Sequence, residues 1–96
     1  MRERYYYVYM ITTWRNTALY IGVTNNLERR LREHRDEVND GFSKRYHTHK
    51  LVWFEQYRDI RDAIGVEKRL KGWTRAKKEA LIAEQNPYWK DLTVKD

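Results

Sequence analysis

Aromatic and β-branched residues dominate two short runs near the start of the chain, at residues 5–12 and 18–23. Such side chains favour β-strands. The polar stretch Arg15-Asn16-Thr17 between them is typical of a turn. The pattern therefore predicts an antiparallel hairpin. A third run of the same kind, at residues 51–57, predicts another strand after a polar loop at 42–50.

Three other segments have the spacing of amphipathic helices. The first follows a cap at Asn25 or Asn26 and runs to about residue 38, where Asn39-Asp40-Gly41 breaks it. The second follows Asp59 and runs through residue 70 toward Trp73, and the third covers residues 75–85. The order β-β-α-β-α-α predicts an α/β (α+β) fold, with helices flanking a small, mostly antiparallel three-stranded sheet. We expect one domain over residues 1–96, with Trp89 and Leu92 docked on its core.

The first predicted helix directs two polar side chains toward the sheet. At about 100° per residue, Leu27 and Leu31 fall in one narrow apolar stripe. His34 lies in the middle of this stripe and Arg30 at its edge. Inward-facing polar groups oppose the usual preference for apolar residues in the core. This exception marks the helix as a candidate part of a functional site.

The second predicted helix has a similar exception. Ala63, Val66 and Leu70 form its apolar stripe, and Glu67 points inward or into the edge of a cleft. A buried carboxylate is costly unless it is paired or binds an ion. Glu67 is therefore a candidate partner for a cation.

Structural explanations for these residues compete with functional ones. Arg30 and Glu67 could form a salt bridge in the core, and His34 could be a hydrogen-bonded core histidine. Tyr9 and Tyr20 could be cross-strand packing residues. One observation favours a functional site over these structural explanations: three predicted elements each direct an ionisable or phenolic group toward the same face of the domain.

The charge distribution indicates a polyanionic partner. The chain has 96 residues and a formal net charge of +6. From Glu67 to Lys78 there are six cations and one carboxylate, and a second basic group contains Lys44, Arg45 and Lys50. Two such clusters with interleaved aromatic residues favour nucleic acid as the partner.

Composition also limits the kinds of metal site and the cellular location that we expect. The chain has no cysteine, which excludes disulfides and thiolate metal sites. No apolar run approaches the roughly 20 residues that span a bilayer. We expect a soluble, cytoplasmic protein without a membrane partner.

The order of the motifs resembles the GIY-YIG nuclease superfamily. Tyr7-Val8-Tyr9 stands where the family has Gly-Ile-Tyr, and Tyr20-Ile21-Gly22 matches the second motif. Arg30 and His34 lie on the following helix as in the family, and Glu67 lies on the next one. The chain is most similar to small stand-alone members and to the N-terminal catalytic domain of the excision-repair nuclease subunit UvrC.

Three positions depart from the family pattern. Tyr7 replaces the glycine of the first motif, and Val23 replaces a lysine that some members have after the second. The family often has an asparagine near the end of the domain that helps to hold the site. Asn86 is the nearest candidate, and it precedes a proline.

The resemblance implies a divalent-metal-dependent endonuclease that hydrolyses phosphodiester bonds in DNA, directed by structure or damage as in repair and recombination. RNA is the alternative substrate. Tyr20 or Tyr9 would take the proton from the attacking water, with help from Arg30 or His34. Glu67 would hold one Mg²⁺ or Mn²⁺ per site. Cleavage of both strands would need a homodimer or two successive visits.

The basic residues would serve binding, in a sequence-independent role. The residues expected to contact the nucleic-acid backbone are Lys44, Arg45, Lys68, Lys71 and Arg75. Two alternatives remain open. One is a nucleic-acid-binding domain that keeps the fold without efficient cutting. The other is a protein-interaction module with a structural Arg30–Glu67 pair.

Overall fold

The computed structural model describes residues 4–36 and 50–93. Strands β1 (Tyr6–Thr12) and β2 (Leu19–Thr24) pair in antiparallel fashion, with Tyr9 opposite Gly22. Asn16, in the connecting turn, has a φ of 58°. Asparagine tolerates this left-handed conformation better than most residues. The predicted hairpin is therefore confirmed.

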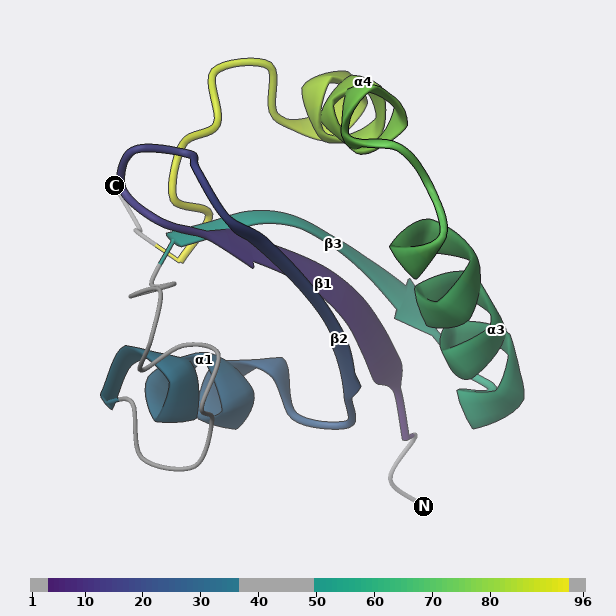
Figure 1. Ribbon diagram of the computed structural model, residues 1–96. Helices are drawn as coiled ribbons and strands as arrows, with labels where there is room; N and C mark the ends of the chain where they lie inside the picture. The colour runs from purple at the N-terminus through teal and green to yellow at the C-terminus, as the bar shows by residue number, and fades with distance from the viewer. Residues whose placement is uncertain (1–3, 37–49, 94–96) are drawn as a thin grey trace.

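Strand β3 (Lys50–Tyr57) pairs in antiparallel fashion with the other side of β1, so the sheet order is β2-β1-β3. The register places Phe54 opposite Tyr9. A register shift between Met10 and Ile11 then leaves Val52 as an extra residue on β3. A bulge of this kind bends and twists the strand. Figure 1 shows the resulting curvature of the sheet.

The described helices are α1 (Leu27–Asp36), α3 (Ile60–Lys71) and α4 (Arg75–Gln85). Each begins after a side-chain oxygen that accepts a backbone N–H of the first turn, as N-caps do. The caps are Asn26, Asp59 and Thr74. The predicted α+β fold and element order are confirmed. The predicted end of the first helix and the loop after it lie outside the described residues. In the parts of the chain that the structure describes, no helix is both long and apolar enough to span a membrane.

The two faces of the sheet carry different helices, because alternate residues of a strand point to opposite faces. Val8 and Met10 of β1 pack with Leu70 of α3 and Ile82 of α4. Tyr9 and Ile11 face the other way, in a cluster that includes Leu27 and Leu31 of α1. Figure 1 shows α1 on one side of the curved sheet, with α3 and α4 on the other. Tyr9 is thus directed toward α1.

The outer edge of β3 is covered by the last residue of α4 and by the segment that follows this helix. The side-chain amide of Gln85 donates to the carbonyl of Phe54 and accepts from its N–H. Further along, the N–H of Leu92 donates to the carbonyl of Leu51 at 2.8 Å. An uncovered edge would offer these groups to other chains. Trp89 and Leu92 pack against the two core clusters, as predicted.

Asn86 holds this segment in place. Its buried Nδ2 donates to the carbonyls of Val52 and Lys90 at 3.1 and 2.8 Å. Its Oδ1 accepts the N–H of Lys90 at 3.0 Å. A single side chain therefore satisfies three backbone groups of two segments.

We expect Asn86→Ala to lower the free energy of unfolding by about 2–4 kcal/mol, because it leaves several partly buried polar groups without partners. Urea denaturation followed by circular dichroism measures this change. Asn25→Ala is the matched control, since Asn25 is exposed and its side chain makes no hydrogen bond within the described residues. Equal stabilities of the two variants would contradict the structural role of Asn86.

Candidate active site

Three side chains form a hydrogen-bonded group between β1 and α1. The hydroxyl oxygen of Tyr9 lies 3.0 Å from Nε2 of His34, and both residues are only 1% exposed. Nε of Arg30 donates to the same hydroxyl oxygen at 3.2 Å. A phenolic oxygen can accept from Arg30 while its O–H donates to an unprotonated Nε2. The inward direction predicted for His34 is thus confirmed.

Tyr20 and Arg30 form the accessible side of this group. The half-buried ring of Tyr20 lies with its centroid 5.2 Å from that of His34 and 6.3 Å from that of Tyr9. The Arg30 side chain is 23% exposed, and its Nη1 lies 3.4 Å from a carboxylate oxygen of Glu33. We call the set Tyr9, Tyr20, Arg30 and His34 the tyrosine–arginine cluster. Tyr9 and His34 form its buried base.

The cluster keeps a fixed positive charge. Burial alone would lower the pKa of the Arg30 guanidinium, but hydrogen bonds and charge interactions with Tyr9, and then with Tyr20, outweigh burial and raise this pKa. Arg30 therefore stays cationic throughout the pH range in which proteins fold. A cation at hydrogen-bond distance favours the anionic form of a neighbouring acid. The cluster is thus suited to stabilise negative charge.

Gly22 is required by the ring of Tyr9. Tyr9 and Gly22 are cross-strand partners, and a Cβ built on Gly22 would lie 2.6 Å from Cζ of Tyr9. No described glycine has a positive φ, so the requirement is one of space and not of backbone conformation. The glycine of the second motif thus makes room for the tyrosine of the first.

Glu67 lies apart from this cluster. It belongs to α3, on the other face of the sheet from α1. Its side chain is 16% exposed, and Oε2 lies 3.6 Å from Nζ of Lys71. Among the described residues, no hydrogen bond or ion pair joins Glu67 to Arg30 or to the rest of the cluster. The core salt bridge considered above is therefore not formed.

The donor atoms near Glu67 limit the kind of metal site. Within residues 4–36 and 50–93, no three His, Cys, Asp or Glu side chains lie close enough together to hold a metal ion. A single accessible carboxylate still suits Mg²⁺, which usually keeps several waters and shares its remaining ligands with substrate phosphates. Among the described residues, Glu67 would be the protein ligand of such a site.

The predicted backbone-contacting cations differ in their environments. Lys68 is exposed, and Lys71 is 53% exposed beside Glu67. Lys44 and Arg45 lie outside the described residues. Lys50, from the same basic group, is only 8% exposed, and burial lowers its pKa against the opposing charge of Asp91. Lys50 is therefore poorly placed to contact a phosphate.

Arg75 has extensive contacts within the protein. Its Nη1 and Nη2 donate to the carbonyls of Thr17 and Asn16, and Nε donates to Glu79 at 2.9 Å. The guanidinium carbon lies 5.5 Å from the ring centroid of Trp89. These contacts tie α4 to the β1–β2 turn, which gives Arg75 a structural role.

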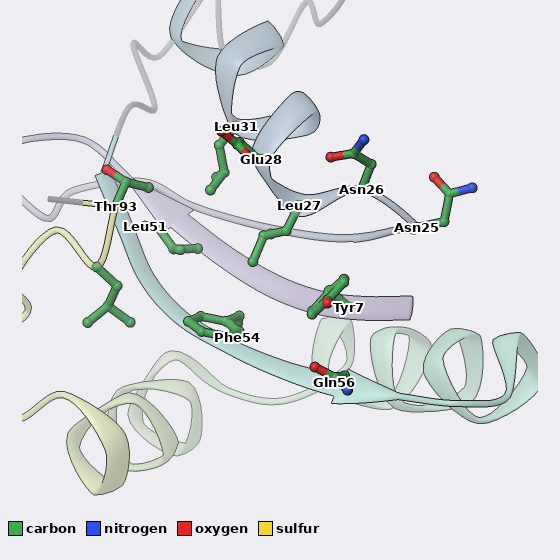
Figure 2. Close-up of a pocket in the computed structure, with 11 residues that line it drawn as sticks. Tyr7, Asn25, Asn26, Leu27, Glu28, Leu31, Leu51, Phe54, Gln56 and Thr93 are labelled. Carbon is green, nitrogen blue, oxygen red and sulfur yellow. The ribbon is translucent and has the colours of Figure 1, made fainter. Parts of the chain in front are cut away.

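A cleft of about 600 Å³ lies between α1 and strands β1 and β3, and one of its lining residues, Phe54, is the cross-strand partner of Tyr9. The sequence pattern did not predict this cleft. Figure 2 shows Tyr7 and Phe54 on the strands, with Leu27 and Leu31 directed toward them from α1. Alternation along β1 and β3 was the signal that could have revealed the floor of the cleft. The lining residues are Tyr7, Asn25, Asn26, Leu27, Glu28, Leu31, Leu51, Phe54, Gln56, Leu92 and Thr93.

Comparison with known proteins identifies the family. Residues 5–80 match the family model described as the GIY-YIG catalytic domain. The chain belongs to the GIY-YIG family. The resemblance inferred from the two tyrosine motifs is thus confirmed, and this GIY-YIG domain is one of a nuclease superfamily.

Small GIY-YIG relatives match over most of their length. A UPF0213 protein of Clostridium perfringens is 34% identical over 80 residues, which cover 83% of this chain and 85% of the relative. A UPF0213 protein of Haloquadratum walsbyi is also 34% identical, over 83% of this chain and 89% of the relative. The solution NMR structure of a UPF0213 protein from Bacillus halodurans has the same fold, with a TM-score of 0.59 and 22% identity over 93% of this chain and 94% of that one. The chain thus resembles small proteins that consist of little more than this domain.

We expect Gly22→Ala to lower the free energy of unfolding by about 1–3 kcal/mol, the usual cost of overpacking. Gly65→Ala is the matched control, because a Cβ at this helical position meets nothing within 4 Å. The control should raise stability by about 0.5–1 kcal/mol, since alanine favours a helix interior over glycine. Urea denaturation measures both. A Gly22→Ala protein as stable as the wild type would show that Tyr9 does not need this space.

Proposed function

We propose that this GIY-YIG domain is a divalent-metal-dependent endonuclease that hydrolyses phosphodiester bonds in DNA, with a preference for structured or damaged substrates. The convergence of Tyr9, Tyr20, Arg30 and His34 from β1, β2 and α1 carries this proposal. A buried packing cluster has no need of a partly exposed guanidinium that interacts with two phenols. A site that hydrolyses a phosphodiester needs both a cation and a proton acceptor.

The burial pattern divides the roles within the cluster. Tyr20 is half-buried, so we assign it contact with the attacking water and acceptance of its proton. Tyr9 is fully buried and bonded to Arg30 and His34, so it positions these two side chains. The guanidinium of Arg30 would assist proton acceptance by the phenol, because a cation favours the anionic form of a neighbouring acid. Arg30 would also stabilise negative charge on the scissile phosphate.

Glu67 is the proposed ligand of one Mg²⁺ or Mn²⁺. The bound cation would stabilise charge on the leaving oxygen. Glu67 lies on one face of the sheet and the tyrosine–arginine cluster lies on the other. Strand β2, which carries Tyr20, is an edge strand, and α3, which carries Glu67, also packs against it. We infer that a strand of DNA at the β2 edge meets Tyr20 from one face and Glu67 from the other.

Purified protein incubated with supercoiled plasmid and labelled single-stranded, flap and nicked DNA tests the activity. We expect cleavage with Mg²⁺ or Mn²⁺ and none with EDTA. Tyr20→Phe should slow cleavage about 10²- to 10⁴-fold, the usual contribution of a general base. Glu67→Ala should abolish it, whereas the control Glu84→Ala, at an exposed carboxylate on α4, should cut like the wild type.

Two outcomes would contradict the nuclease assignment. Identical products from the wild type and Glu67→Ala would identify a contaminating nuclease. Retained binding without cleavage of any substrate would favour the second candidate, a nucleic-acid-binding domain of the same fold. Two observations support that candidate: Tyr7 replaces the motif glycine, and Lys71 already pairs with the Glu67 carboxylate.

Backbone contacts by the exposed lysines of α3 predict a salt effect. Lys68→Ala should reduce the slope of log Kobs against log salt concentration by about 0.9, the value for one lost contact with duplex DNA. Binding titrations in EDTA at several salt concentrations measure this slope. Lys90→Ala, at an exposed lysine in the C-terminal segment, is the control and should leave the slope unchanged. An unaltered slope for Lys68→Ala would remove Lys68 from the interface.

A further inference from the structure

The cleft between α1 and the sheet is lined by neighbours of Tyr9, which belongs to the buried base of the tyrosine–arginine cluster. Tyr7 precedes Tyr9 by two residues and therefore lies on the same face of β1. Phe54 is the cross-strand partner of Tyr9 on β3. On the helix side, Leu31 packs in the same apolar cluster as Tyr9 and lines the cleft. A group bound in the cleft would thus lie on the Tyr9 side of the cluster.

The aromatic and apolar lining of the cleft suits a flat heterocyclic ring. The rings of Tyr7 and Phe54 form part of its floor, and Leu27 and Leu31 extend toward them from α1 (Figure 2). The volume of about 600 Å³ lies within the usual range for ligand sites, which combine apolar walls with a few polar groups. An aromatic floor offers stacking to any planar ring.

The polar groups stand at the margin of the cleft. Asn25 and Gln56 are exposed, and their side chains make no hydrogen bond within residues 4–36 and 50–93. Each amide offers both a donor and an acceptor, which suits the edge of a nucleobase. The carboxylate of Glu28 also lines the cleft and disfavours a phosphate inside it. The charge of Arg30, by contrast, favours a phosphate outside the cleft, on the side of the cluster.

We propose that this cleft binds one unpaired nucleobase of the substrate, stacked on Tyr7 and Phe54, while the adjoining phosphate lies at Arg30. This site rests on the proposed nuclease function and specifies its substrate as nucleic acid with at least one base out of the helical stack. Tyr7 stands where the family motif has glycine. A glycine there would remove part of the aromatic floor, so the departure from the motif creates the site.

Fluorescence of 2-aminopurine tests this proposal, because stacking on an aromatic ring quenches it. Two DNA duplexes are titrated with wild-type protein in EDTA, one with a single unpaired 2-aminopurine and one with the same base fully paired. We expect the protein to bind the duplex with the unpaired 2-aminopurine roughly 5- to 150-fold more tightly than the fully paired duplex, which is the effect of one base–aromatic stack. Its fluorescence should fall on binding.

Variants at Tyr7 separate stacking from apolar contact. Tyr7→Leu should lose most of the preference for the unpaired duplex, whereas Tyr7→Phe, which retains a ring, should keep it. Tyr88→Leu is the matched control, because Tyr88 is exposed and does not line the cleft. Gln56→Ala alters only an exposed side chain and should lower the preference several-fold, so the test does not depend on the folding of one variant.

Two results would overturn the proposal in distinguishable ways. Equal binding of both duplexes by the wild type, or a full preference in Tyr7→Leu, would remove the base site while plasmid cleavage still supported the nuclease. Failure of the wild type to bind either duplex, together with absence of cleavage, would remove the nuclease function and the base site together.

Discussion

The hydroxyl group of Tyr9 is the point on which the arrangement of α1 depends. It is buried between the central strand β1 and α1, where a polar group needs partners. His34 and Arg30 supply them, one turn apart on α1. The inward face of this helix contributes few apolar residues to the core, chiefly Leu27 and Leu31. Its position over the sheet is therefore set as much by hydrogen bonds to one phenol as by apolar packing.

The two faces of β1 have different roles: one packs in the apolar core, and the other carries the side chains of the candidate site. Val8 and Met10 pack against α3 and α4 in an apolar cluster of the ordinary kind. The alternate residues Tyr7 and Tyr9 serve the cleft and the cluster on the α1 face. A residue on the α1 face that lies outside the hydrogen-bonded group can therefore change without altering the contacts of the apolar face. A tyrosine at position 7 in place of the motif glycine is such a change.

Local signals explain why the elements were predictable and the partners were not. Strand composition and the caps Asn26, Asp59 and Thr74 depend on neighbouring residues only, and the periodicity of α1 placed His34 and Arg30 inward. Whether Glu67 meets Arg30 or Lys71 depends instead on the face of the sheet that α3 covers. Sheet order and connections decide that face. The need for Gly22 likewise appears only once its register against Tyr9 is known.

The tail after α4 links the stability of the sheet edge to the site. Asn86 fixes this segment through its bonds to Val52 and Lys90, and Leu92 then reaches the cluster that contains Tyr9. Leu92 also lines the cleft beside that cluster. Asn86 thus supports part of the cleft lining from a distance, since it holds the segment that carries Leu92. The position of Asn86 before a proline is compatible with this role, because the bonds to Val52 and Lys90 are made by the Asn86 side chain.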